Sequence, residues 1–468
     1  MKLLRQNIRL IALLMAVLLL SLILYGAFSI ANYGSRWFSS GANNYLRRTK
    51  ANVTAGTIID RNNLVLATSK DGKREYVADE AMRRSLVHVV GDSANNVAYG
   101  VESFMANYLY AFNESYPERL VNALQGKKRQ GNDIRISVDA RLSKKAYELF
   151  PTGKSGAIVV MNYRTGELLA LQSYPSFDPS RVTQLDEDNP QKPFWNRATK
   201  WVSAPGSTFK LITMASALNT FPDAETRTFE CLGTLPLTDT TITDASNAVH
   251  HQLTLQRALV VSCNITFAKA ALELGDTNLG RTAAAFGFGD YFLFSDLVVE
   301  NSSYPSTNRT EKELAWTGPG QSSLQSTPLH MCLVASAVAN RGVMMEPKLL
   351  LQATNSAGEN RFTFQPRIYR TALSEAHADT LKTAMYEAVR RGTATRAAVP
   401  DLRVCAKTGS AQVDGQQETN AWVVGFIDDL RYPYAACVVV EDAGGGGAVA
   451  APILGELFRY ISSQGAAQ

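Results

Sequence analysis

The stretch Ala204-Pro205-Gly206-Ser207-Thr208-Phe209-Lys210 combines helix-breaking residues with a serine and a lysine, just before an apolar run. Proline and glycine end any preceding element, and the run after Ser207 predicts a buried helix, so we expect Ser207 at or near a helix N-terminus. Lys210 follows one turn later on the same face, within reach of the Ser207 hydroxyl. A neutral lysine, its pKa lowered by burial or by a nearby cation, can accept a serine proton. The stretch therefore has the parts of an activated nucleophile.

The pair of Ser207 and Lys210 is not distinctive by itself. No other lysine in the chain has a serine three residues before it. Chance alone, however, gives on the order of one or two such pairs in a chain of this length. An ordinary helix that begins with serine and carries an exposed lysine explains the pair equally well, so other stretches must decide.

Two further stretches carry polar groups of the same kind. Lys407-Thr408-Gly409-Ser410 follows a strand-like run. At a sheet edge it offers an ammonium and a hydroxyl to a carboxylate, and Gly409 leaves room for a substrate backbone. Ser262-Cys263-Asn264 interrupts a helical run, and its polar groups need partners, because each buried unpaired group costs about 1–3 kcal/mol. Taken alone, the two stretches also fit an ordinary strand end and a structurally satisfied helix break.

Together, Ser-x-x-Lys, Ser-x-Asn and Lys-Thr-Gly form, in this order, a motif set shared by penicillin-binding proteins and active-site serine β-lactamases. The chain resembles a class B penicillin-binding protein, a monofunctional peptidoglycan D,D-transpeptidase, of the compact penicillin-binding protein A-like type with a short pedestal. It departs from the family's usual residues at Asn63 and Ser322, where glycine is more common, and at Asn420-Ala421-Trp422, where a histidine often precedes the tryptophan. Beyond the motifs, the resemblance extends over residues 59–67, 133–139, 156–179, 195–198, 326–329, 339–342, 406–412 and 446–453.

The resemblance implies a role for each motif residue. Ser207 attacks the peptide bond between two D-alanines of a peptidoglycan stem, and Lys210, neutral in the free enzyme, accepts its proton. Ser262 relays a proton to the departing amine, with Lys407 behind it. The backbone N–H groups of Ser207 and Ser410 form the oxyanion hole. The residues implied to bind the substrate are Asn264, Thr408, Gly409 and Ser410. β-Lactam antibiotics are expected to acylate Ser207.

The expected fold class is α+β. Five strand-like runs (156–163, 167–172, 402–407, 421–427 and 434–440) fit one mostly antiparallel five-stranded sheet with helices on its faces. We expect the segments 1–9 as a cytoplasmic tail, 10–31 as a transmembrane anchor, 32–50 as a stalk, 51–150 as a non-catalytic pedestal (dimerisation-like) domain and 151–468 as the transpeptidase domain.

The N-terminal region predicts a membrane anchor. Residues 10–35 carry no charge, and about 20 apolar residues span a bilayer, whereas a cleaved signal has a shorter apolar part of roughly 7–15. The cations that follow the stretch, Arg36, Arg47 and Arg48, nearly balance those that precede it, Lys2, Arg5 and Arg9. The positive-inside rule therefore does not decide the orientation. We expect a single-pass protein of the bacterial cell membrane with its body on the outer face.

Composition excludes several other classes of protein. The 468 residues are 46% hydrophobic and 19% charged with a net charge of +5, which fits two or three globular domains and no nucleic-acid partner. The cysteines at 231, 263, 332, 405 and 437 are scattered, without C-x-x-C spacing, and His250-His251 is the one histidine cluster. We expect no disulfide framework, no metal site and no other cofactor.

Two alternatives to the transpeptidase stay open. One is a hydrolase of the same superfamily: a D-alanyl-D-alanine carboxypeptidase, a β-lactamase or a β-lactam sensor. The other is a mainly scaffolding protein, in which anchor and pedestal bind a polytopic glycan polymerase of the shape, elongation, division and sporulation family. The resemblance implies such a polymerase partner for the transpeptidase as well.

Overall fold

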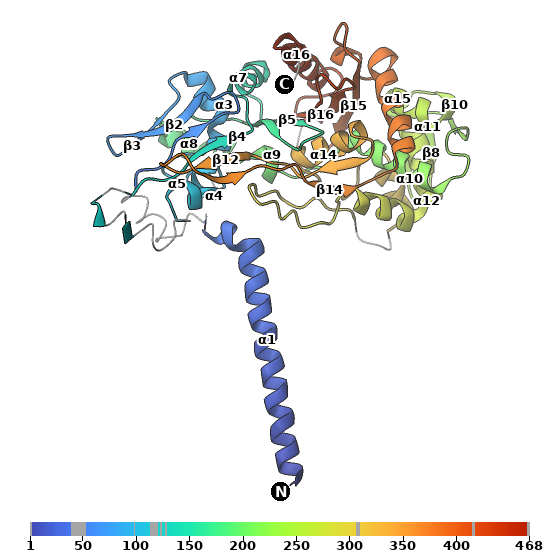
Figure 1. Ribbon diagram of the computed structural model, residues 1–468. Helices are drawn as coiled ribbons and strands as arrows, with labels where there is room; N and C mark the ends of the chain where they lie inside the picture. Colours follow the sequence, from blue (N-terminus) through green and yellow to red (C-terminus); the bar gives the residue numbers. More distant parts are fainter. Residues whose placement is uncertain are drawn as a thin grey trace.

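The computed structural model describes residues 2–38, 53–97, 99–112, 120–121, 124–126, 129–305, 309–413 and 417–465. Most of the predicted stalk, residues 39–50, lies outside this range. Helix α1 (Lys2–Phe38) projects alone from the body of the molecule, with the N-terminus at its far end (Figure 1). Its segment Leu4–Ile30 has a mean hydropathy of 2.7 and no buried residues in its most apolar window. By length and composition, α1 can cross a membrane.

The larger domain is built on a five-stranded antiparallel sheet, as the sequence predicts. The sheet combines two strands from the start of this domain with three strands from near the end of the chain. Its strands, in spatial order, are β15 (Val404–Ala411), β16 (Asn420–Ile427), β17 (Tyr434–Val440), β5 (Gly156–Asn162) and β6 (Leu168–Tyr174). Strand β15 lies at the edge and pairs only with β16. This edge faces the candidate site described below.

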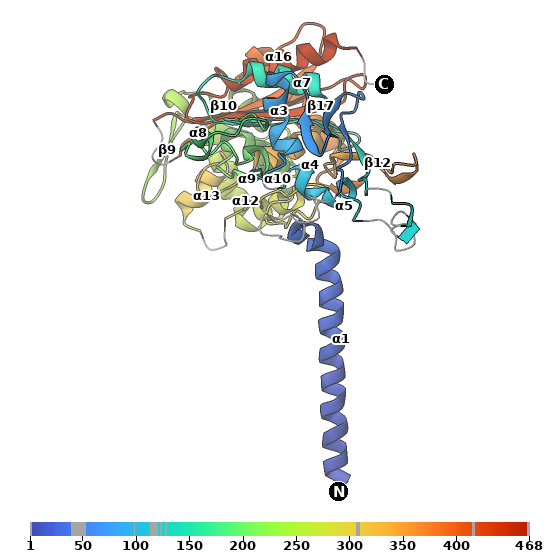
Figure 2. The same cartoon turned by 90° about the vertical axis from the view of Figure 1, so that its left-hand side faces the viewer.

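Helices cover both faces of this sheet, which explains why its central strands are buried throughout. Alternate side chains of β5 point to opposite faces: Val159 packs in one apolar cluster, and Ile158 in the other. Helix α14 (Pro328–Ala339) contacts one face and α16 (Ala450–Ser463) the other. Figure 2 shows α16 and α7 (Ala140–Leu149) on the side of the body away from α1.

The smaller domain contains a six-stranded sheet. Its strands, in spatial order, are β13 (Asn360–Thr363), β12 (Leu350–Thr354), β4 (Asp133–Ile136), β1 (Ile58–Ile59), β2 (Val65–Lys70) and β3 (Lys73–Tyr76). The turn between β1 and β2 holds Asn63 at φ 68°, a left-handed conformation that asparagine tolerates where the family more often has glycine. Strands β12 and β13 come from far beyond residue 150, so the chain returns to the pedestal after entering the larger domain.

The helix predicted after Ser207 and the helical run interrupted at Ser262 are both present, with short strands between them. Helices α10 (Lys210–Thr220), α11 (Leu255–Val261) and α12 (Asn264–Ala285) form as expected. Four short strands that the sequence analysis missed lie between α10 and α11: β7 (Thr228–Cys231), β8 (Thr234–Pro236), β9 (Thr241–Thr243) and β10 (His251–Thr254). They pair as β7 with β10 and β8 with β9. Each is too short to give a clear alternating pattern.

The other described elements support these two sheets. The further strands are β11 (Val343–Met345) and β14 (Ile368–Thr371), which pair with each other. The further helices are α3 (Glu80–Val90), α4 (Val101–Phe104), α5 (Ala106–Leu109), α8 (Gln184–Glu187), α9 (Arg197–Lys200), α13 (Glu311–Thr317) and α15 (Glu375–Arg391). Three 3₁₀ turns complete the set: η1 (Gly206–Phe209), η2 (Ala245–Asn247) and η3 (Thr395–Ala397).

Candidate active site

Ser207 lies in the 3₁₀ turn η1, which leads directly into α10. Gly206 precedes it at φ 54°, and a Cβ added there would lie 2.9 Å from the backbone oxygen of Ser410. Only glycine therefore lets η1 pack this closely on β15. Gly409 serves the same packing, since a Cβ there would lie 3.0 Å from the oxygen of Pro205. Gly409 therefore allows β15 to pack closely on η1. We expected it only to leave room for a substrate backbone.

The break between α11 and α12 places the Ser262 side chain beside both motif lysines. Ser262 ends α11 in a left-handed conformation (φ 64°, ψ 36°), and Asn264 begins α12. The Lys407 side-chain nitrogen lies 2.7 Å from Ser262 Oγ and 2.9 Å from the backbone oxygen of Thr408. The Lys210 nitrogen lies 3.3 Å from the same Ser262 Oγ. One hydroxyl therefore bridges two lysines.

Lys210 is fully buried, and its hydrogen bonds go to the Ser262–Asn264 segment. It donates to the backbone oxygen of Ser262 at 2.6 Å and to Asn264 Oδ1 at 2.7 Å, besides Ser262 Oγ. Among the hydrogen bonds of the described residues, none joins Lys210 to Ser207, the partner that its spacing predicts. In enzymes without substrate such contacts are often long and tighten only in the reacting complex.

Burial lowers the pKa of both lysines. It lowers the pKa of Lys210 to about 8, against the opposing effects of Asp244 and Cys263. The pKa of Lys407 falls well below its ordinary value because of burial and then the charge of Lys210. A pKa of about 8 leaves part of Lys210 in the neutral form near neutral pH, the form that a role as a base requires. The three acceptors around the Lys210 nitrogen fit an ammonium group.

The edge of β15 provides the candidate oxyanion hole. The side chain of Gln321 donates to the backbone oxygen of Ser410 at 3.3 Å, so that carbonyl points away from β16. A strand residue directs its N–H and C=O to the same edge, so the Ser410 N–H also faces the open edge. This is the direction that a role in an oxyanion hole requires.

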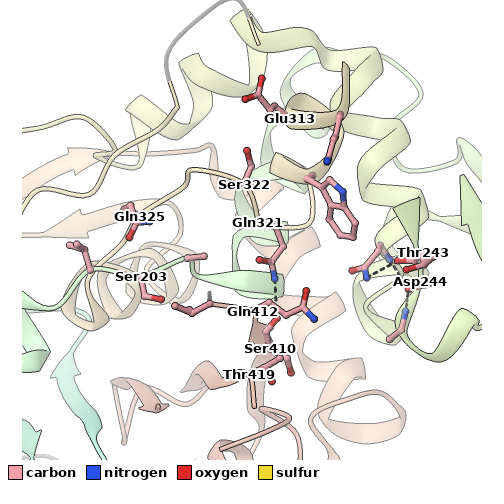
Figure 3. A pocket seen from close by; sticks show the side chains of 17 residues that line it. Ser203, Thr243, Asp244, Glu313, Gln321, Ser322, Gln325, Ser410, Gln412 and Thr419 are labelled. Atoms are coloured by element: carbon pink, nitrogen blue, oxygen red, sulfur yellow. Dashed lines mark hydrogen bonds between the residues drawn. The ribbon is translucent and has the colours of Figure 1, made fainter. Parts of the chain in front are cut away.

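Two adjoining pockets open along this edge. The smaller, of about 410 Å³, is lined by Ser207, Ser262, Asn264, Thr408, Gly409 and Ser410 among others. The larger, of about 1000 Å³, also includes Asn264 and Ser410. Figure 3 shows the larger pocket, with Thr243 and Asp244 at one end and Ser203 at the other. Lys210 and Lys407 are fully buried behind this wall.

Several residues of the site lie outside the three sequence motifs and were not predicted. Thr393 lines the smaller pocket, and its hydroxyl lies 2.7 Å from that of Thr408. Gln321 and Trp316 line both pockets. Asp244 accepts the backbone N–H of Asn264 at 3.0 Å and so positions the Ser-x-Asn segment. None of these residues belongs to a recognisable local pattern, because each reaches the site from a separate element.

The antiparallel sheet, the serine at the start of a buried helix and the two lysines that share a second serine define a serine acyl-transfer enzyme. The model of the penicillin binding protein transpeptidase domain matches residues 156–459. The chain belongs to this family, as a class B penicillin-binding protein, which confirms the resemblance found in the sequence.

Several relatives of known name and structure match over most of this chain. "Peptidoglycan D,D-transpeptidase PbpA" of Mycolicibacterium smegmatis is 29% identical over 87% of both chains. "Peptidoglycan D,D-transpeptidase MrdA" of Escherichia coli is 28% identical over 71% of this chain and 57% of that protein. The penicillin G acyl-enzyme complex of penicillin-binding protein A from M. tuberculosis superposes with a TM-score of 0.79, at 26% identity, over 88% of this chain and all of that one. A D,D-transpeptidase domain from Eggerthella lenta gives 0.76, at 29% identity, over 89% of this chain and all of that one.

Proposed function

We propose that this protein is a peptidoglycan D,D-transpeptidase that works through an acyl-enzyme on Ser207. The observation that carries the proposal is the Ser262 hydroxyl between two buried lysines, in the same pocket as Ser207. Buried lysines with lowered pKa values suit proton transfer near neutral pH. The names and acyl-enzyme structures of the relatives support the same activity.

The proposed reaction begins with the removal of the proton from the Ser207 hydroxyl. Lys210, in its neutral form, accepts this proton. Ser207 Oγ forms a bond to the carbonyl carbon of the penultimate D-alanine, while the backbone N–H groups of Ser207 and Ser410 stabilise the oxyanion. The bond to the terminal D-alanine nitrogen breaks, and Ser262 delivers the proton to that departing amine.

The substrate contacts follow from the free polar groups at the pocket wall. Asn264 uses its oxygen for Lys210 and one amide N–H for the backbone oxygen of Thr243 at 3.4 Å, which leaves its second amide N–H to donate to the donor peptide. The Thr408 hydroxyl, paired with Thr393, faces the terminal carboxylate with Lys407 behind it. An acceptor amine, entering through the larger pocket, then releases the acyl group from Ser207 and forms the cross-link. A β-lactam leaves its own amine tethered to the acyl group, so its adduct persists.

The test is intact-mass spectrometry of the full-length protein in detergent after exposure to benzylpenicillin. We expect one stable adduct on the wild type and none on Ser207→Ala. No adduct on either protein would refute the proposed chemistry and favour the alternative of a mainly scaffolding protein. An adduct that disappears within minutes would instead indicate a hydrolase.

We further propose that α1 anchors the protein in the bacterial cell membrane, with the body on the outer face beside a polytopic glycan polymerase. The exposed apolar surface of α1 supports the anchor, and the family supports the partner. Protease added to intact cells without an outer barrier should cleave the body. A body protected until the membrane is opened would refute this orientation.

A further inference from the structure

A pocket outside the catalytic centre lies on α8 and the loop that leads from it to α9. It has a volume of about 430 Å³, and none of its residues lines either of the two pockets at the candidate active site. The proposed acyl transfer gives this pocket no role. Its lining residues include Asp186, Glu187, Asn189, Lys192, Phe194 and Trp195.

Trp195 gives this pocket an aromatic wall that is fixed in position. Trp195 is 38% exposed, although tryptophan is mostly covered in folded proteins. The guanidinium carbon of Arg197 lies over the indole, 5.4 Å from the ring centre, and this cation–π contact holds the ring from one side. Phe194 extends the wall and packs edge-to-face on the buried Phe177, with ring centres 4.6 Å apart. A fixed, exposed ring is a surface on which a ligand can stack.

Polar groups with unused hydrogen-bonding capacity lie beside this wall. Asp186 Oδ2 accepts the backbone N–H and the hydroxyl of Thr183, and within the described part of the chain its Oδ1 has no partner. Asn189 Oδ1 accepts the backbone N–H of Gln191 at 2.9 Å, which leaves its amide N–H groups to donate. Among the hydrogen bonds and ion pairs of the described residues, none involves the Glu187 carboxylate. The pocket therefore offers hydroxyl acceptors and an amide donor beside an aromatic ring.

The loop that carries these residues is held from two sides. Arg197 in α9 is buried, donates to the backbone oxygen of Gln191 at 2.6 Å and pairs with Glu441 at 2.6 Å. From α3, the buried His88 donates its Nε2–H to the backbone oxygen of Pro193 at 2.6 Å. The pocket is thus formed before a ligand arrives, which reduces the entropy lost on binding.

This combination of groups suits carbohydrate recognition. An aromatic ring packs on the apolar C–H face of a sugar ring, while carboxylates and amides bind the hydroxyl and acetamido groups at its edge. Asp186 and Glu187 outnumber the one ammonium group, that of Lys192, so an anionic ligand is disfavoured and a neutral one is not. We propose that this pocket binds the glycan strand of peptidoglycan, whose N-acetylated sugars are uncharged. The choice of this glycan rests on the proposed function.

The chain leads directly from the proposed glycan pocket to the catalytic one. After Trp195 it passes through α9 to Val202 and Ser203, which line the larger pocket of the active site. Figure 3 shows Ser203 at the end of that pocket opposite Asp244. Val202 follows Trp195 by seven positions, so their Cα atoms lie at most about 25 Å apart. Stem peptides are attached to glycan strands, and a strand held at Trp195 would raise the local concentration of its stem peptides at Ser207.

Binding of a neutral oligosaccharide tests the pocket without using the enzyme activity. The probe is chitotetraose, a tetramer of N-acetylglucosamine, added to the full-length protein in detergent and followed by saturation-transfer difference NMR, with empty micelles as the blank. We expect weak, saturable binding to the wild type. Trp195→Ala should weaken it about tenfold or more, because the sugar loses the ring on which it packs. Glu187→Gln should weaken it about fivefold, because a charged acceptor is replaced by a neutral one.

The matched controls remove exposed side chains outside the pocket. They are Leu185→Ala, 83% exposed in α8, and Tyr291→Ala, an aromatic residue that is 75% exposed elsewhere on the surface. Both should bind chitotetraose as the wild type does. Trp195→Phe keeps an aromatic face and should retain most of the affinity. Near-UV circular dichroism verifies the fold of each variant.

Two results would overturn the proposal directly. The first is the absence of saturable binding to the wild type, a measurement that needs no variant, whether or not a lysine-rich peptide binds to the two carboxylates instead. The second is equal affinity in the wild type, Trp195→Ala and Glu187→Gln.

Benzylpenicillin separates this pocket from the catalytic one. Acylated protein should bind chitotetraose with unchanged affinity, and Trp195→Ala should be acylated at the wild-type rate. Displacement of chitotetraose by benzylpenicillin would place the sugar in the catalytic pocket and overturn the proposal. Binding that depends on Trp195 in a protein that forms no penicillin adduct would support the glycan pocket and refute only the proposed acyl transfer.

Discussion

The rate at which benzylpenicillin acylates Ser207 should depend steeply on pH, because Lys210, the proposed base, can accept a proton only in its neutral form. Its pKa of about 8 makes the neutral fraction about 1% at pH 6, about 10% at pH 7, about half at pH 8 and about 90% at pH 9. The rate constant should therefore rise about tenfold per unit between pH 6 and 7 and level off above about pH 9. Lysine loses its proton as pH rises, so the sign is an increase.

The assay is a quenched time course of adduct formation, followed by intact mass at low benzylpenicillin concentration, so that the second-order rate constant is measured. Near-UV circular dichroism at each pH controls for loss of fold, and drug incubated without protein controls for its own hydrolysis. A flat profile from pH 6 to 9 would show that Lys210 is not the titrating base. A rate that falls with rising pH would show that the protonated form is the active one.

Three substitutions follow from the contacts at the site. Lys210→Ala should abolish acylation, and wild-type labelling by fluorescent penicillin in a protein with normal circular dichroism would contradict its role. Thr393→Val removes the hydroxyl partner of Thr408. The loss of one net hydrogen bond, about 0.5–1.5 kcal/mol, should lower the acylation rate constant roughly 2–12-fold. An unchanged rate constant would show that Thr408 does not need the Thr393 hydroxyl. Gly206→Ala should lower the free energy of unfolding by about 1–3 kcal/mol, measured by thermal unfolding. The loss should exceed that of the control Gly72→Ala, because Gly72 is also left-handed but a Cβ added there meets nothing within 4 Å. Equal losses would mean that close packing at η1 contributes little to stability.

The sheet and the motif positions were predictable from the sequence because each depends on a local pattern. The apolar runs of β5, β16 and β17 are continuous, as in strands covered on both faces. Ser207 follows a proline and a glycine, which locate the start of the helix. The break at Ser262 is visible as a polar interruption in an apolar helix.

The features of the site that could not be predicted from the sequence depend on contacts between distant segments. The partner of Lys210 could not be read from its spacing, because the left-handed turn at Ser262 brings a different hydroxyl to it. The lowered pKa values of Lys210 and Lys407 depend on burial in the folded protein. Thr393 lies on a loop without any motif.

The return of the chain to the pedestal limits how the protein can be divided. Strand β12 pairs along one edge with β4, where Ala353 lies opposite Ile134, and along the other with β13. A fragment that begins at residue 151 lacks β4 and would present β12 to solvent with one open edge, a template for aggregation. The pedestal and the catalytic domain therefore fold as partners, and a stable catalytic fragment should include residues from β1 onward.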